Sequence, residues 1–374
     1  MDTAAFTNRQ TGHFALTVGG AQAFVPAPLP DSLPLPPEII LALDRASRAV
    51  ATLDGIGETL DNPRLLFRPF MRREAVLSSQ IEGTQASLTD LYEYEVAGRS
   101  RTPDAREVAN YVVALEHGLR RLADLPICVR LVHEMHAELM RGVRGDNETV
   151  GDFRDRQVWI GAEGTPISDA RFVPPPHAQV PDEMSEWEKW VNRESLLPPL
   201  IRAAMLHYQF ETIHPYQDGN GRLGRLLIVL FLVSSGVLKT PLLYVSAFLE
   251  RNRSAYYDHL LTLSQQGDWT PWLAFILRGV EEQARDAIAR SRHLRDIQDR
   301  YRRLPVSPKA RELAEYLFTS PMITRPRVQS VLELSARGAG LVVDQLVAQG
   351  VLVEVGQSRP ALFMSSEIMD AIRT

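Results

Sequence analysis

The segment Ile213-His214-Pro215-Tyr216-Gln217-Asp218-Gly219-Asn220-Gly221-Arg222-Leu223-Gly224-Arg225 stands apart from the rest of the sequence. It places a histidine, a carboxylate, a glycine-rich turn and two arginines within one short run. Because glycine adopts positive φ without a steric cost, Gly219 and Gly221 allow the N–H groups around Asn220 to turn inward toward anionic oxygens. The apolar helix that begins near Arg222 adds the positive end of its dipole. The segment therefore predicts a phosphate-binding loop at the start of a buried helix.

The side chains of this loop suit the attack of a hydroxyl group on a nucleotide phosphate. His214 is the natural general base, because imidazole accepts a proton near neutral pH. Asp218 is a suitable ligand for a Mg²⁺ ion that bridges phosphate oxygens. Arg222 and Arg225 lie three residues apart, and we expect both guanidinium groups to clamp the outer phosphates of a triphosphate.

Other interpretations of these residue types fit less well. The string from Gly219 to Gly224 has GxGxxG spacing, but a helix rather than a strand is expected before it, and no Lys-Ser/Thr pair of a Walker loop follows. His133, His136 and His207 lack zinc-protease spacing and are interpreted as helix-packing histidines. The tryptophans at helical spacing are interpreted as core or rim aromatics; these are Trp187, Trp190, Trp269 and Trp272.

Outward from the loop, apolar spacing predicts a mainly α-helical chain. The expected helices cover 38–54, 72–81, a stretch from about 87, two within 105–140, then 181–191, 200–210, 221–234, 254–263 and 271–304. Gly55 and Gly57 are expected to end the first helix, and 61–63 to form a turn. The first ~35 residues, which end in a proline-rich run, predict an extended arm. Segments 157–160 and 171–173 predict one β-hairpin.

The last ~70 residues predict a winged helix-turn-helix domain, with helices at 307–318, 324–331 and 335–349 and a hairpin at 351–355 and 361–364. Residues 305–374 contain seven Lys/Arg and seven Asp/Glu. DNA-binding modules usually carry a basic excess. Both DNA contact, through Arg325, Arg327 and Arg337, and a protein-interaction or dimerisation role therefore stay open.

Composition excludes several classes of protein. The 374 residues are 45% hydrophobic and 23% charged, which rules out a disordered or fibrous chain and suggests two or three domains. The net charge of −5 gives no general attraction for nucleic acid or an anionic membrane. Cys128 is the single cysteine, the start does not resemble a signal peptide, and the apolar run 226–233 is far shorter than the ~20 residues of a membrane span. We expect a cytoplasmic protein with no membrane partner.

Residues 214–225 resemble the Fic motif, HxFx(D/E)GNGRxxR, whose family members mostly transfer AMP from ATP to protein hydroxyls. The only departure is Tyr216 in place of Phe. Doc-type kinases carry Lys near Gly221, and its absence favours AMP transfer over phosphate transfer. The resemblance extends over about 34–263. It implies a Fic-type helical bundle with a small β-hairpin flap, divided into an N-terminal part (1–105), a catalytic core (106–270), a helical linker (271–304) and the winged helix-turn-helix domain (305–374).

The resemblance also implies regulation. Residues 72–83 look like the inhibitory helix of Fic proteins, (S/T)xxxE(G/N), here Ser78, Glu82 and Gly83, with Glu82 paired to Arg225. A carboxylate in the last turn of a helix is disfavoured by a few tenths of a kcal/mol, so Glu82 itself suggests a partner. A flap resembling the family's target-docking segment contains Gln157, Val158, Trp159 and Ile160.

The implied substrates are ATP, with Mg²⁺ as cofactor, and a Tyr, Thr or Ser hydroxyl on either a partner protein or this protein itself. The implied assembly is a homodimer. Hydrolysis of an AMP–protein bond at the same site, and DNA-binding regulation, stay as alternatives. The implied nucleotide-binding residues are Asp218, which also binds the metal, Gly219, Asn220, Gly221, Arg222, Arg225, Asn252 and Tyr257, beside the catalytic His214.

Overall fold

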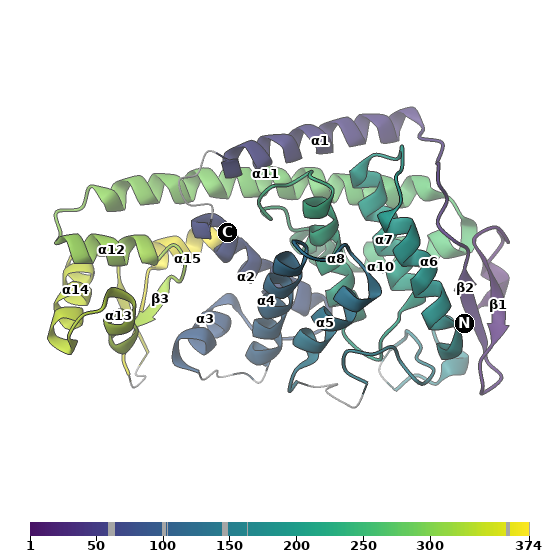
Figure 1. Ribbon diagram of the computed structural model, residues 1–374, viewed down its shortest axis with the longest axis horizontal. Helices are drawn as coiled ribbons and strands as arrows, with labels where there is room; N and C mark the ends of the chain where they lie inside the picture. Colours follow the sequence, from purple (N-terminus) through teal and green to yellow (C-terminus); the bar gives the residue numbers. More distant parts are fainter. Residues whose placement is uncertain are drawn as a thin grey trace.

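The computed structural model describes residues 1–58, 64–98, 102, 104–143, 149–162, 164–356 and 360–373. It confirms a mainly α-helical fold (Figure 1). The helices are α1 (Pro37–Glu58), α2 (Arg64–Ile81), α3 (Leu88–Ala97), α4 (Asp104–Arg121), α5 (Val129–Met140), α6 (Val180–Asn192), α7 (Pro199–Ile213), α8 (Asn220–Ser234), α9 (Ser246–Arg251), α10 (Arg253–Gln266), α11 (Trp269–Arg302), α12 (Pro308–Tyr316), α13 (Arg325–Leu332), α14 (Ala336–Ala348) and α15 (Ser366–Arg373).

Two adjacent helices, α7 and α8, form the centre of the core. Almost every residue of both is buried, and α8 contacts α2, α4, α5 and α7. Each fully buried Leu or Phe contributes about 1.5–3 kcal/mol of hydrophobic free energy. The packed core around α7 and α8 thus holds the residues at the end of α7 and the start of α8 in fixed positions. Trp187 and Trp272 are buried as core aromatics, as the sequence predicted.

The first two helices differ from the prediction. Helix α1 continues through Gly55 and Gly57 to Glu58, because packing against the length of α11 outweighs the ~1 kcal/mol cost of a glycine in a helix. Helix α2 begins at Arg64 rather than at Arg72 and contains Pro69. The predicted turn at 61–63 lies outside the described residues.

The expected extended arm is wrong for the first part of the chain. Strands β1 (Gly12–Leu16) and β2 (Gln22–Pro26) form an antiparallel hairpin in which Phe14 faces Phe24 across the strands. Conversely, the hairpin predicted at 157–160 and 171–173 contains one bridge, between Ile160 and Phe172. The N–H of Phe24 donates to the carbonyl of Val173 at 2.9 Å. In the second predicted strand, Phe172 therefore bonds to Ile160 and Val173 bonds to Phe24 of β2. Segments 157–160 and 171–173 do not form a regular two-stranded hairpin.

The C-terminal part contains the expected helices and hairpin. It also contains a strand, β3 (Met322–Thr324), and a last helix, α15, which the sequence analysis missed. Strands β3, β5 (Leu362–Met364) and β4 (Val353–Val355) form an antiparallel sheet in that order. Helix α15 follows and contacts α2. The assignment as a winged helix stays a prediction.

Helix α11 runs alongside α1 and connects both parts of the chain (Figure 1). It packs against α7, α9 and α10 and also against α12 and α15. Near its middle, the buried guanidinium group of Arg290 donates to the carbonyls of Ala371 and Ile372, each at 3.2 Å, and so caps α15. Among the described residues, no helix is both long and apolar enough to cross a membrane.

Candidate active site

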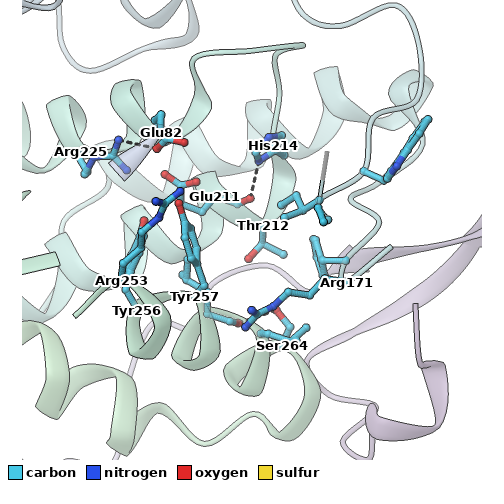
Figure 2. Close-up of a pocket in the computed structure, with 18 residues that line it drawn as sticks. Glu82, Arg171, Glu211, Thr212, His214, Arg225, Arg253, Tyr256, Tyr257 and Ser264 are labelled. Atoms are coloured by element: carbon cyan, nitrogen blue, oxygen red, sulfur yellow. Dashed lines mark hydrogen bonds and ion pairs between the residues drawn. The ribbon is translucent and has the colours of Figure 1, made fainter. Parts of the chain in front are cut away.

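A cavity of about 530 Å³ opens beside the histidine loop (Figure 2). Four segments line it: the end of α2, the junction of α7 and α8, helix α10, and the irregular segment around the Ile160–Phe172 bridge. The lining residues that the sequence analysis named are Glu82, Trp159, Ile160, His214, Gly221, Arg225 and Tyr257. The structure therefore brings the predicted base, inhibitory carboxylate, arginine and flap together around one space.

His214 is the residue that ends α7, in a left-handed conformation with φ 51°. Such a backbone is unfavourable for a residue other than glycine, and its surroundings hold it there. The backbone N–H of His214 donates to the carbonyl of Phe210 at 2.9 Å, and the Nε of Arg154 donates to the carbonyl of His214 at 2.9 Å. Contacts from two different segments thus fix the backbone from which the imidazole projects.

The ring of His214 is set up to accept a proton. Its Nδ1 lies 3.3 Å from the carbonyl oxygen of Glu211. Because a carbonyl oxygen only accepts, Nδ1 carries the hydrogen and Nε2 is left as the basic atom. Burial, together with the charge of Arg154, lowers the pKa of His214 to about 4. The imidazole is therefore neutral at pH 7.

The loop between α7 and α8 is locked by its own side chains. The amide of Asn220 accepts from the N–H of Tyr216 and donates to its carbonyl, both at 2.9 Å. The ring of Tyr216 stacks on His136, and its hydroxyl lies 2.9 Å from Nδ1 of His133. Gly219 has φ +81° as expected, whereas Gly221 is helical, so the expectation of positive φ there is wrong. Asn220 thus supports the loop and does not line the cavity.

Arg225 is completely buried and is held by the end of α2. Its Nε donates to the hydroxyl of Ser78 at 2.8 Å, and its Nη2 donates to the carbonyl of Ser78 at 2.9 Å and to Oε1 of Glu82 at 2.7 Å. Glu82 directly follows the last helical residue, rather than lying within the last turn, and Gly83 continues the chain with φ +96°. A Cβ atom on Gly221 would collide with Oε1 of Glu82, so this glycine makes room for the contact.

The two arginines diverge instead of forming the expected pair. Arg222 is 1% exposed and forms a buried ion pair with Glu107 on α4. It also lies 3.4 Å from Oδ1 of Asp218. The two guanidinium groups point apart because each binds a partner on a different helix. Arg222 binds Glu107 on α4, and Arg225 binds Ser78 and Glu82 at the end of α2. Arg222 does not line the cavity.

Asn252 also lies away from the cavity lining, because its amide donates to the carbonyl of Phe248 at 2.8 Å at the start of α10. Asp218 and Gly219 adjoin the cavity through the loop without lining it. The carboxylate of Asp218 is 44% exposed, and both of its side-chain contacts use Oδ1, which suits Oδ2 to hold a cation. No cluster of three potential metal ligands exists among the residues that the structure describes.

Of the four predicted flap residues, Trp159 and Ile160 line the cavity, whereas Gln157 and Val158 do not. Trp159 is 42% exposed and its indole donates to the carbonyl of Thr165 at 2.7 Å. Gln157 donates to the carbonyls of Val158 and Pro174 at 2.9 and 3.0 Å. The backbone N–H of Ile160 is bonded to Phe172, so the segment is ordered by short-range contacts.

Sequence reasoning did not identify three residues that shape the site. Glu107 neutralises Arg222, Arg154 holds the His214 carbonyl, and Glu211 forms part of the cavity wall. Glu107 could have been suspected from the sequence, because a carboxylate among the apolar positions of an amphipathic helix is expected to need a buried partner. The contacts of the other two depend on segments that are far apart in the sequence.

Two family models match this sequence: the Fic/DOC family N-terminal model over residues 40–120 and the Fic/DOC family model over residues 126–232. Together they match half of the chain. The chain belongs to the Fic/DOC family. The protein adenylyltransferase Fic of Drosophila erecta is 32% identical over 154 residues, 41% of this chain and 28% of that protein. The Drosophila melanogaster protein of the same name is 31% identical over 154 residues. The chain thus spans less than a third of the length of these curated relatives.

Solved structures share the fold of this Fic protein. A Fic family protein from Desulfovibrio desulfuricans G20 aligns with a TM-score of 0.60 and 21% identity, over 90% of this chain and 98% of that chain. A Fic domain containing signaling protein from Bacteroides thetaiotaomicron VPI-5482 aligns with a TM-score of 0.53 and 19% identity, over 67% of this chain and 97% of that chain. The expected Fic-type helical bundle is confirmed.

Proposed function

We propose that this protein transfers AMP from ATP to a Tyr, Thr or Ser hydroxyl of a protein target, which includes itself, and that Glu82 restrains the reaction. The observation that carries this proposal is the meeting, in one cavity, of a neutral His214 with an Arg225 held by Glu82. Membership in the Fic family and similarity to proteins named adenylyltransferases support the same reaction.

In this mechanism Nε2 of His214 accepts the proton of the target hydroxyl. The hydroxyl oxygen bonds to the α-phosphorus, and the bond from that phosphorus to the oxygen bridging to the β-phosphate breaks, so pyrophosphate leaves. Arg225 and the N–H groups at the start of α8 balance the charge on the leaving group. Asp218 would hold Mg²⁺, which when bound neutralises charge on phosphate oxygens.

Glu82 restrains this reaction by occupying Arg225. With the guanidinium group bonded to Ser78 and Glu82, only Nη1 has no hydrogen-bond partner within the described structure. A triphosphate must displace Glu82 to place its outer phosphate on Arg225. A nucleotide that binds without displacing it has its α-phosphorus out of line with the incoming hydroxyl, and a misplacement of about 1 Å can cost ~10²-fold in rate.

The flap supplies the docking surface for the target in this proposal. The segment around Ile160 lies at the mouth of the cavity with an exposed Trp159 beside it. A target segment that adds as a strand along this edge would present its hydroxyl to His214.

The test is mass spectrometry of the full chain and of Glu82→Gly after incubation with ATP and Mg²⁺, alone and with cell lysate. An AMP adduct on a hydroxyl residue is expected. His214→Ala should abolish the adduct and change the Kd for ATP less than about threefold, since the imidazole handles the proton and not the phosphates. His293→Ala, an exposed histidine on α11, is the matched control and should keep the activity. Adduct formation by His214→Ala would disprove the general-base role.

Hydrolysis of an AMP–protein bond uses the same residues. A water oxygen bonds to the phosphorus of the modified side chain, the bond from that phosphorus to the target oxygen breaks, and the proton that water loses to His214 ends on the target oxygen. Release of AMP from premodified protein, measured beside the forward assay, distinguishes the two directions. For the C-terminal domain we propose protein contact or dimerisation rather than DNA binding, because Arg325 is paired with Asp344 on α14 at 2.8 Å. Salt-dependent binding to a random DNA duplex would contradict this assignment.

A further inference from the structure

Two glycines of α8, one turn apart, each make room for a carboxyl group. A Cβ atom on Gly221 would collide with Oε1 of Glu82, and a Cβ atom on Gly224 would collide with Oε1 of Glu211. A glycine inside a helix costs about 1 kcal/mol relative to alanine. Inhibition by Glu82 accounts for the first glycine. The second one, with Glu211 on α7, has no role in the function proposed above.

Glu211 has the contacts of a group that faces a ligand. Its side chain is 10% exposed and lines the cavity, and its Oε1 has no hydrogen-bond partner in the described part of the chain. The nearest charged or titratable atom on its own helix is Nδ1 of His207, at 3.9 Å and itself without a partner. Figure 2 shows Glu211 between the Glu82–Arg225 pair and His214. A buried polar atom without a partner costs about 1–3 kcal/mol, which a bound ligand would recover.

The charge state of Glu211 decides which ligand atom it can contact. Burial, with a smaller contribution from the charge of Glu82, raises the pKa of Glu211 to about 8, although Arg225 opposes this shift. Glu211 is therefore protonated at pH 7 and carries one hydrogen-bond donor. The other titratable or charged groups around it are His207 on α7, His214 after it, and Arg253, Tyr256 and Tyr257 on α10.

We propose that Glu211 contacts the nucleotide as a neutral carboxylic acid that donates a hydrogen bond to a phosphate oxygen. This inference rests on the proposed function, because it takes the cavity as the ATP site. Phosphate oxygens only accept hydrogen bonds, and Glu211 adjoins Arg225 at the helix turn where the phosphates are placed. Loss of its proton would put a second negative charge beside Glu82, facing the phosphates.

The experiment measures the Kd for ATP with Mg²⁺ on the full chain, by calorimetric titration at pH 7.5 and 9.5. If only the neutral acid binds, the affinity of the wild-type protein falls roughly 25-fold over this range, as the protonated fraction falls for a pKa of about 8. Burial raises the pKa of Tyr256 and Tyr257 above 10, and burial lowers the pKa of His207 and His214 to about 3 and about 4, so these groups do not titrate in the range.

Three variants separate a donor from a merely structural side chain. Glu211→Gln keeps an N–H donor without a titratable proton, so its affinity should be nearly independent of pH. Glu211→Ala should bind ATP at least fivefold more weakly at pH 7.5, and Gly224→Ala should do the same by displacing the side chain. Glu183→Gln is the matched control, because burial raises the pKa of Glu183 to about 7 on α6, outside the cavity.

The outcomes distinguish this inference from the proposed function. A wild-type affinity that does not change between pH 7.5 and 9.5, or an equal loss in Glu211→Gln and Glu211→Ala at pH 7.5, overturns the role of Glu211 and leaves the proposed function intact. Absence of ATP binding by the wild-type chain at both pH values overturns both. A pH profile altered by Glu183→Gln also overturns the inference, because the titrating group would then lie elsewhere.

Discussion

Replacing Glu82 by glycine should increase AMP transfer at least tenfold, although it removes a side chain that takes no part in the chemistry. The magnitude follows from the contact with Arg225. A hydrogen bond to a charged group contributes about 1.5–3 kcal/mol. Arg225 is fully buried but the Glu82 side chain is 32% exposed, so solvent screening favours the lower end of this range. Because about 1.4 kcal/mol corresponds to tenfold in an equilibrium constant, release of this one contact accounts for about a tenfold gain.

The assay follows AMP incorporation into the protein itself and into lysate proteins at saturating ATP. Glu82→Gln, which keeps the shape but not the charge, should give an intermediate gain. Arg225→Ala should give none, since it removes the phosphate clamp together with the inhibitory partner. Glu194→Gly changes an exposed glutamate outside the cavity and should behave as wild type. If Glu82→Gly is no more active than wild type on any of these substrates, the inhibitory role of Glu82 is wrong.

Three further outcomes test the remaining parts of the site. Asp218→Ala should abolish the dependence of transfer on Mg²⁺ together with most of the activity, as measured by a metal titration. In the proposed mechanism the neutral form of His214 is active, and burial lowers its pKa to about 4. The value of kcat/KM should therefore stay within about twofold from pH 7.5 down to pH 6 and decline only toward pH 4. A decline in kcat/KM centred near pH 6.5 would contradict this role. Glu107→Ala removes the closer carboxylate partner of the buried Arg222 and leaves only Asp218, at 3.4 Å, among its described carboxylate partners. It should cost about 3–5 kcal/mol of stability in a denaturant titration, whereas a loss below 1 kcal/mol would show that Asp218 or solvent replaces Glu107.

The core helices were predictable from local pattern. Apolar spacing placed α7 and α8 close to their observed limits, and the run from His214 to Arg225 contained both the proposed base and the arginine that pairs with Glu82. Such features depend on residues a few positions apart, and periodicity detects these directly.

The features that were wrong depend on long-range contacts. Arg222 and Arg225 have the same local environment in the sequence, yet Glu107 on α4 takes one and the end of α2 takes the other. The hairpin β1–β2 escaped prediction because its strands are short and bounded by polar residues, and its packing comes from Phe172 and Val173 far along the chain. No pattern within a short window contains these pairings.

The long helix α11 connects the C-terminal part to the helices that surround the cavity. Its 34 residues span about 50 Å at 1.5 Å per residue, and one rigid rod packs against both α10 and α15. Since Arg290 holds α15 to α11 and α15 contacts α2, directly packed helices connect the C-terminal part to the segment that holds Arg225, so a partner bound to the C-terminal part has a short structural path to the cavity.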